Sequence, residues 1–409
     1  MEEEPPPPDD PAKDNTAAHN TRERTGSDVS STTGSLVSTR TLRSEDITNL
    51  VENGRTYANE TYHMPCDQEE QDRLAILHQV YVNALRGELT TTKITPSVKR
   101  ILDLGTGPGE WAVAMARKYP HAEVVAIDLA VWDLEATEGS PPTGRVTWEI
   151  DDLDVWLPNH ELEDLTSHLG TLPLFGGSQG ADSPQLTAKW KGKVPQTAQP
   201  RSPGEAASFD SSVQDPSPDV GWHFSEPFDF IHLRGLKGAF AYWEDVYAEI
   251  YNSLKPGGSV EVVDWEMPLG PDHFLPNIKK LYKSMMTASF KCGRPLGTSH
   301  MHPTYLEDAG FKDVRTTYVN VPVGTWSDDP EQKKIGKMWM VVLIESLEPH
   351  CLRLLTKHGD VEKVWTKEEV REAVEAGKRE ILEWEGRVQK REVEGWVGNF
   401  KWMVGRKPV

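Results

Sequence analysis

Apolar residues occur along much of the chain in short runs, and between these runs they recur at the spacing of an amphipathic helix. Runs that predict strands lie at 100–104, 123–127, 146–149, 228–233 and 259–263. Residues 111–119 and 243–254 have apolar positions three and four apart, as a helix with one buried face requires. Strands that alternate with helices in this way build a parallel sheet covered by helices on both faces.

The pattern changes after Pro303, where longer helices replace the regular alternation. The elements predicted there are a helix at 304–309, a strand at 314–321, helices at 333–357 and 366–385, and a final strand at 399–404. Another amphipathic helix begins near Asp67, ahead of the first strand, and Asp67 and Glu70 have capping-box spacing. We expect an α/β Rossmann-like fold with a seven-stranded, mostly parallel sheet, an antiparallel last strand and an N-terminal helical lid.

Two segments lack the apolar residues that a core needs. Residues 1–45 begin with acidic and proline runs and continue as Ser/Thr-rich sequence, so we expect a disordered tail. Residues 158–226 are rich in Pro, Gly, Gln and Ser and are interpreted as a low-complexity insertion that loops out between two core elements. One half of a single α/β domain, with its lid helix, is then expected at 46–157. The remainder, with the C-terminal helices and the last strand, is expected at 227–409.

Net charge and composition narrow the possible partners. With 44 basic and 64 acidic residues, the chain has a formal charge of −20. This charge opposes direct binding to nucleic acid, because affinity for that backbone comes mainly from Lys and Arg. The three cysteines have neither disulfide-framework nor metal-ligand spacing. Since no apolar run reaches the roughly 20 residues of a spanning helix and no signal-peptide pattern is present, we expect an intracellular protein without membrane contact.

The strongest chemical signal is the segment at 100–130, RILDLGTGPGEWAVAMARKYPHAEVVAIDLA, in which a strand leads through a glycine-rich turn into a helix. Glycine adopts backbone angles that other residues avoid and lets a ligand approach the main chain closely. This turn is therefore a candidate ligand-binding loop. Its candidate binding residues are Asp103, Gly105, Thr106, Gly107 and Gly109.

The second strand of this segment ends in Asp128 and Leu129. Asp128 lies about 20 residues after the glycine turn, where a carboxylate can accept hydrogen bonds from both hydroxyls of a ribose. Dinucleotide-binding turns have the pattern G-x-G-x-x-G and hold a pyrophosphate. Here the pattern is G-x-G-x-G, with Asp103 two positions before it, and a carboxylate there repels phosphate and suits a cationic group. The pattern points to S-adenosylmethionine as the cofactor, bound by the half at 46–157.

Two further strand ends carry candidate site residues. Asp151 and Asp152 follow the third strand, where a carboxylate can accept a hydrogen bond from the adenine amino group; a solvated acidic turn is the alternative. The fourth strand ends in His232 and Arg234, at the edge where open α/β sheets bind ligands. His232 is then a wall of the pocket or a general base. Arg234 is a site residue or a structural ion-pair partner, and the catalytic residues stay unassigned.

Segments along most of residues 50–409 also match a known pattern. They begin with Glu52 to Tyr57 and Pro65 to Asp67, and they continue through LDLGTGPGEWA, IDLA, FDFIHLRGL and LKPGGSVEVVDWE to the terminal Gly405-Arg406-Lys407-Pro408. This pattern resembles that of the fungal LaeA-like methyltransferases, whose best-known members partner velvet-domain regulators. The resemblance implies a class I methyltransferase fold, S-adenosylmethionine as cofactor, a nuclear location, and Tyr57 as a lid contact over the cofactor. An ordinary buried aromatic is the alternative for Tyr57.

Two functions follow from this resemblance. One is a regulatory methyltransferase that acts with protein partners such as velvet-domain proteins on secondary metabolism or development, for which an acidic surface suits contacts with protein rather than DNA. The other is a metabolic enzyme that methylates a small molecule. A cofactor-binding scaffold without turnover is a third interpretation. The methyl acceptor is not identified by the sequence.

Overall fold

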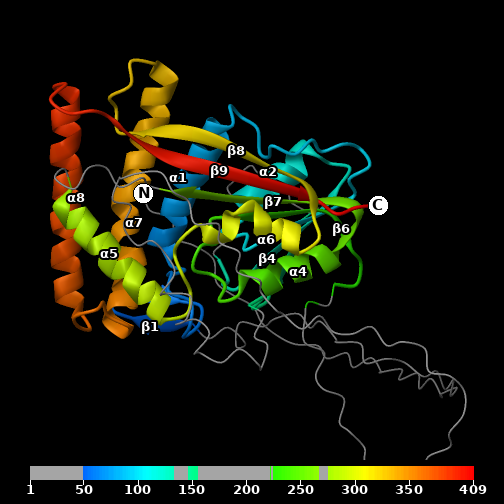
Figure 1. The fold of residues 1–409 in the computed structure, drawn as a ribbon, viewed down its shortest axis with the longest axis horizontal. Coiled ribbons are helices and arrows are strands. Elements are labelled where there is room, and N and C mark those ends of the chain that lie inside the picture. The colour runs from blue at the N-terminus through cyan, green and yellow to red at the C-terminus, as the bar shows by residue number, and fades with distance from the viewer. Residues whose placement is uncertain (1–48, 133–145, 155–221, 223, 267–274) are drawn as a thin grey trace, which may run out of the picture. The chain divides into compact units, whose positions relative to one another are not determined.

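Seven strands form one sheet in the computed structural model (Figure 1). Their order is β5-β4-β3-β6-β7-β9-β8. The bounds are β3 Arg100–Leu104, β4 Glu123–Asp128, β5 Val146–Ile150, β6 Phe228–Arg234, β7 Leu254–Glu266, β8 Lys312–Val323 and β9 Trp396–Arg406. Strand β9 pairs with β7 and β8 in antiparallel fashion, and the other pairs are parallel. The predicted Rossmann-like sheet of mostly parallel strands with an antiparallel last strand is confirmed.

The structure describes residues 49–132, 146–154, 222, 224–266 and 275–409. The predicted tail at 1–45 and most of the predicted insertion at 158–226 lie outside these residues. The end of the predicted insertion does pack on the core, because Trp222 and Phe224 contact its buried residues. The Trp222 amide donates to Glu249, and its indole Nε1–H donates to the Leu153 carbonyl at 3.1 Å. The looping-out segment is therefore shorter than predicted at this end.

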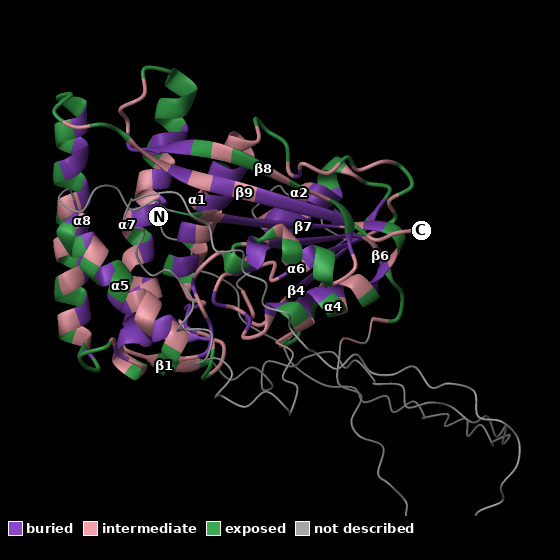
Figure 2. Ribbon diagram, in the orientation of Figure 1, coloured by how far each residue is buried: buried purple, intermediate pink, exposed green. Residues whose placement is uncertain are grey.

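Alternation along β3 and β4 explains why both faces of the sheet are covered. Leu102 and Leu104 pack in one core cluster with α4 (Trp243–Ser253), whereas Ile101 packs on the other face with α2 (Glu110–Lys118). Successive residues of a strand point to opposite faces, so a strand buried on both sides is apolar throughout. Figure 2 shows the central strands buried along most of their length. Apolar runs without alternating polar residues are the sequence signature of this arrangement.

The order of the strands creates a place for a ligand. From β3 the chain moves outward to β4 and β5, and then crosses back to β6 on the other side of β3. At such a reversal the two connections leave the carboxyl ends of β3 and β6 in opposite directions and open a crevice between them. The glycine turn follows β3 at this crevice.

Four helices pack together at the β8 and β9 side of the sheet: α1 Gln68–Ala84, α5 Pro276–Lys291, α7 Pro330–Lys357 and α8 Lys367–Gln389 (Figure 1). Helix α7 contacts the other three. The shorter elements are the hairpin β1 Leu50–Glu52 and β2 Arg55–Tyr57, the 3-10 turn Ser299–Met301 and α6 Pro303–Asp308. In the part of the chain that the structure describes, no helix has the length and apolar content to span a bilayer.

Local sequence signals account for several helix ends. Asp67 is the N-cap of α1, and its side chain accepts from the Glu70 amide, as the spacing predicts. Thr366 and Glu369 form a complete capping box at the start of α8. Helix α5 and the β1–β2 hairpin are absent from the sequence prediction. A signal for α5 does exist, because Pro276 occupies its first turn and apolar residues follow at helical spacing.

Candidate active site

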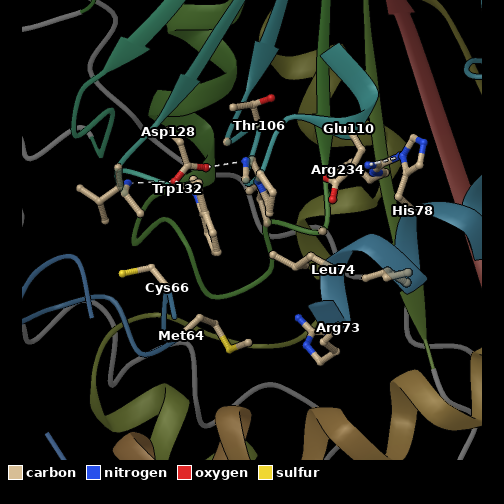
Figure 3. A pocket seen from close by; sticks show the side chains of 18 of the residues that line it. Met64, Cys66, Arg73, Leu74, His78, Thr106, Glu110, Asp128, Trp132 and Arg234 are labelled. Carbon is tan, nitrogen blue, oxygen red and sulfur yellow. Dashed lines mark hydrogen bonds between the residues drawn. The ribbon is translucent and has the colours of Figure 1, made fainter. Parts of the chain in front are cut away.

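A cleft of about 120 Å³, here called the central cleft, lies at the carboxyl ends of β3, β4 and β6. Figure 3 shows the glycine turn on one side, with α1 and the segment 58–66 across from it. Asp128 and Trp132 lie at one end, and Glu110 and Arg234 lie at the other. The predicted site residues that line the cleft are Asp103, Gly105, Thr106, Gly107, Asp128, Leu129 and Arg234. Helix α1 thus occupies the position expected of a lid.

The three glycines of the turn have different tasks. All have positive φ, at 66° for Gly105, 59° for Gly107 and 86° for Gly109, a region that side chains with a Cβ rarely adopt. A Cβ on Gly109 would lie 2.3 Å from Trp148, so this glycine allows the turn to pack on β5. A Cβ on Gly107 would meet only Leu74, at 3.7 Å, and would project into the cleft. Gly107 is therefore the glycine that keeps the cleft free for a ligand, whereas Gly109 lies outside its lining.

Asp128 is fixed by three donors at the end of β4. The Gly107 amide donates to Oδ2 at 2.7 Å, and the Ala130 amide and the Trp132 indole donate to Oδ1 at 2.9 and 3.0 Å. Burial raises the pKa of Asp128, and these three hydrogen bonds oppose that rise. The carboxylate is held in one orientation at the cleft wall and keeps lone pairs for a ligand hydroxyl. Leu129 lies next to it in the lining.

Asp103 is held from behind by His232. The His232 Nδ1–H donates to Asp103 Oδ1 at 2.8 Å, and the Thr106 hydroxyl donates to Oδ2 at 2.6 Å. The His232 ring is stacked on Trp111 at 3.7 Å between centroids. His232 is thus separated from the central cleft by Asp103, and the structure gives it neither of the two predicted roles. It orients the carboxylate that lines the cleft, because its ring is locked by stacking and by this hydrogen bond.

Arg234 is a half-buried cation at the far end of the cleft. Its Nη2 lies 3.2 Å from Nδ1 of His78, and its guanidinium lies 4.9 Å above the Tyr81 ring. Burial lowers the pKa of His78 to about 3, so the imidazole is neutral and accepts from Arg234. Burial also lowers the pKa of Arg234. Among the residues that the structure describes, Arg234 has no carboxylate within ion-pair distance, so the predicted structural ion pair is not formed and the guanidinium can bind an anionic group.

A smaller cavity of about 70 Å³, here called the side cavity, adjoins the central cleft beyond Leu129 and Asp128. Asp151 and Asp152 line it, at the place where the sequence predicts the adenine to lie. Burial raises the pKa of Asp151. Asn59 donates to Asp152 at 3.5 Å from the opposite wall.

The structure does not bring Tyr57 to either of these cavities. Its side chain is fully buried, its hydroxyl has no hydrogen-bond partner in the described part of the chain, and its ring lies 4.2 Å from the guanidinium of Arg353 on α7. Tyr57 therefore fastens the hairpin to α7 and corresponds to the buried-aromatic alternative. Tyr62, five residues later, lines both cavities in its place.

Several lining residues escaped the sequence prediction. Tyr62, Met64 and Cys66 reach the cleft from a segment without regular secondary structure, and Leu236 and His350 reach it from distant parts of the chain. Only tertiary packing places these side chains at the cleft. Trp132 is the one missed residue with a local signal, because it follows Asp128 by only four residues. Its indole N–H donates to the Asp128 carboxylate.

Comparison with known proteins identifies the family. Residues 77–315 match the family model described as "Methyltransferase domain". The chain is 30% identical to "Secondary metabolism regulator LAE1" of Cochliobolus heterostrophus over 346 residues, covering 81% of this chain and 89% of that protein. It is 25% identical to "Methyltransferase pytC" of Aspergillus terreus, covering 76% and 74%. It is also 27% identical to "Protein-methionine methyltransferase laeA" of Emericella nidulans, covering 73% and 63%.

The described residues fit the cofactor of such enzymes. S-adenosylmethionine supplies a methyl group from a sulfonium centre, and it carries a ribose, an ammonium and a carboxylate. Asp128 can accept hydrogen bonds from the ribose hydroxyls. Asp103 and Glu110 would oppose the positive charges of the cofactor's ammonium and sulfonium groups, and the guanidinium of Arg234 suits the cofactor's carboxylate. The methyltransferase domain model matches more than half of this chain, and the regulator LAE1 aligns with it over most of that regulator's length. The chain therefore belongs to the LaeA-like methyltransferases that use S-adenosylmethionine.

Proposed function

We propose that this methyltransferase regulates secondary metabolism and development in the nucleus, together with velvet-domain protein partners. The observation that carries the proposal is the relationship to the regulator LAE1, which extends over 81% of this chain and 89% of that protein. The net charge of −20 supports action through protein contacts rather than through direct binding to DNA.

Deletion of the gene tests the regulatory role. We expect the transcripts of many biosynthetic genes to change together, and we expect a pull-down of the tagged protein to recover velvet-domain proteins. A dedicated metabolic enzyme would instead lose one methylated product and accumulate its unmethylated precursor, with other transcripts steady. That second pattern would contradict the proposal.

Complementation separates methyl transfer from a scaffold role. A Gly107→Val protein should not restore the transcripts, because the branched side chain occupies the cofactor's space. Full rescue by this variant, at wild-type protein levels, would mean that regulation does not require the methyl donor. Gly87→Val is the matched control, because Gly87 also has positive φ, at 91°, but a Cβ there meets nothing within 4 Å.

A small-molecule acceptor is the second candidate for the reaction itself. The relative pytC is named a methyltransferase without a regulatory description. A cavity of about 410 Å³ that adjoins the central cleft at Lys237, Trp265 and His350 also favours a small acceptor.

A further inference from the structure

A third cavity, larger than the central cleft and the side cavity, adjoins the central cleft. It has a volume of about 410 Å³ and is here called the apolar cavity. The ends of β7, β8 and β9 form its floor, and α5, α7 and α8 form its walls. Lys237, Trp265 and His350 line both the apolar cavity and the central cleft, so the two spaces meet at these three residues.

The walls of the apolar cavity are mostly hydrocarbon. Its apolar lining residues include Val323, Ile278, Leu281, Met285, Leu296, Leu343, Leu347, Ile381 and Trp396. Besides Lys237 and His350, the polar residues in the lining are Tyr282, Thr298, Ser346, Asn399 and the exposed Glu266. A cavity of about 150 Å³ with walls of this kind holds benzene, so 410 Å³ leaves room for two or three fused rings. The volume also falls within the range of roughly 300–1,000 Å³ typical of small-molecule sites.

Among the three residues at the junction, His350 is the one that can accept a hydrogen bond from a neutral ligand through a side-chain lone pair. The ammonium of Lys237 is already paired with Asp264 at 3.2 Å and donates to the Trp265 carbonyl at 2.6 Å. It also lies 3.4 Å from the centroid of the Trp265 ring. The Lys237 ammonium is thus engaged by Asp264 and Trp265, which leaves His350 as the candidate hydrogen-bond acceptor for a ligand.

The hydrogen bond of His350 determines its tautomer. Its Nδ1 lies 2.7 Å from the carbonyl oxygen of Ser346, and since a carbonyl only accepts, Nδ1 carries the hydrogen. Burial, with Arg73 and His63 nearby, holds the pKa of His350 well below its usual range, so the ring is neutral. Its Nε2 therefore carries a lone pair, and no donor among the described residues is bonded to it.

We propose that the apolar cavity is the methyl-acceptor site, and that it takes a neutral aromatic small molecule whose hydroxyl or amine donates a hydrogen bond to Nε2 of His350. The proposal rests on the proposed function only in taking the central cleft as the place of methyl transfer. His350 acts as a positioning residue, because it holds the acceptor's heteroatom at the opening between the cavity and the cleft. We propose a free small molecule as the acceptor, and the tests below distinguish it from a protein side chain.

Two probes that differ in a single donor test the site. 2-Naphthol has an aromatic body and one hydroxyl, and 2-methoxynaphthalene has the same rings without a donor. Calorimetry with the full-length protein should show that 2-naphthol binds about tenfold more tightly, as one hydrogen bond of about 1.4 kcal/mol implies. His350→Phe should remove this difference. Equal affinities in the wild type, or a difference that survives in His350→Phe, would overturn the proposal.

A second pair of variants tests the location. Leu347→Trp places an indole in the apolar cavity and should weaken both probes at least tenfold, with S-adenosylmethionine affinity within twofold of the wild type. Lys337→Trp adds the same side chain on the exposed part of α7 and should change neither. Probe binding that is unaffected by Leu347→Trp would place the probe elsewhere. Retained cofactor binding shows that the cleft and the fold are intact, so this result does not depend on the regulatory role in cells.

The wild-type protein provides a test that needs no folded variant. With methyl-labelled methionine, 2-naphthol should shift the resonance of Met285 in the cavity wall and leave that of Met115, buried under β3 and β4, in place. An unmoved Met285 resonance would contradict the proposal. A second result would also contradict it: the enzyme binds neither probe but transfers labelled methyl groups from the cofactor to methionine side chains of a protein. The acceptor would then be a protein side chain.

Discussion

The central cleft and the apolar cavity lie side by side and are built in opposite ways. The wall of the cleft that carries the glycine turn comes from one short stretch, from Asp103 to Trp132, and depends on backbone amides and carboxylates. The lining of the cavity comes from residues between 237 and 399 and consists mainly of side chains on three helices. A local stretch thus specifies the methyl donor, whereas distant helices shape the proposed acceptor site. Methyltransferases with the same cofactor residues can therefore act on different acceptors.

Electrostatics separates the two spaces as clearly as their origin. The cleft brings Asp103, Asp128, Glu110 and Arg234 around one small volume, which matches a ligand with charges of both signs. In the apolar cavity, Lys237 is paired with Asp264, the neutral His350 lies at the junction, and the one carboxylate among the described lining residues, Glu266, is exposed to solvent. We expect changes on one side to leave the other side functional, and the following predictions test that separation.

The largest effect should come from Gly107→Val. A branched side chain at φ 59° costs about 1–2 kcal/mol in backbone strain and fills the space in front of Asp128. S-adenosylmethionine binding should fall below detection in calorimetry, while 2-naphthol still binds. Gly87→Val carries the same kind of strain outside the cleft and should bind the cofactor normally. Comparable cofactor affinity in the two variants would show that Gly107 does not keep the central cleft free for the cofactor.

Asp128→Ala should have the next largest effect. It removes an oriented, charge-assisted acceptor, which is worth about 1.5–3 kcal/mol, so affinity for S-adenosylmethionine should fall at least tenfold with the fold retained. Asp72→Ala, on the exposed face of α1, is the control. Because burial raises the pKa of Asp128, the wild-type carboxyl takes up a proton at a higher pH than an ordinary aspartate. Affinity should therefore decline on mild acidification, and Asp128→Asn should abolish this decline. An Asp128→Ala affinity equal to the wild type would remove the ribose assignment.

Arg234→Met should lower the affinity for S-adenosylmethionine only by removing the contact with the cofactor's carboxylate. We expect about a tenfold loss for S-adenosylmethionine, equivalent to one charged hydrogen bond of about 1.4 kcal/mol. 5′-Methylthioadenosine lacks the amino acid end and should bind as it does to the wild type. Arg315→Met, on the exposed part of β8, is the control. Equal losses for both ligands would mean that Arg234 supports the cleft structurally.

The smallest effect should come from Asp360→Asn, near the ends of α5 and α7. Burial acts to raise the pKa of Asp360, but hydrogen bonds from the Lys363 and Glu362 amides and from Ser284 and Trp365 outweigh it and hold the pKa at about 2. A depressed native pKa stabilises the fold above the ordinary aspartate pKa, and the gain is lost as the pH falls through 2. The variant should lose less than about 1 kcal/mol of stability at neutral pH, because solvent screens this partly exposed carboxylate.

Thermal unfolding followed at several pH values checks this last prediction. The difference between Asp360→Asn and the wild type should be greatest near neutrality and shrink on acidification below the pKa of an ordinary aspartate. Asp328→Asn, an exposed residue before α7, should unfold like the wild type throughout. S-adenosylmethionine affinity should not change in either variant. A large loss of affinity in Asp360→Asn would show that the two regions are coupled.

The sequence alone determined the sheet and the half of the cleft that follows β3 and β4. Strand positions follow from apolar runs whose alternate residues are buried on opposite faces, whereas the order of the strands is seen only in the structure. Asp103, Gly107 and Asp128 could be identified because hydrogen bonds within one stretch hold them in place. Signals of this kind are local, so one chain is enough to detect them.

Only the tertiary structure decided which side chains complete the site. The sequence does not show whether Tyr57 or Tyr62 reaches the cofactor site. In the structure Tyr57 is buried against Arg353, and Tyr62 lines the cleft. His232 stands at a strand end that faces the ligand, but stacking on Trp111 turns its ring behind Asp103. The sequence leaves open whether the aromatic and methionine residues between Trp265 and Tyr305 form a core or a pocket wall, because such residues fill a core or line a cavity according to how closely the helices approach one another. The structure places Trp265, Tyr282 and Met285 at the apolar cavity.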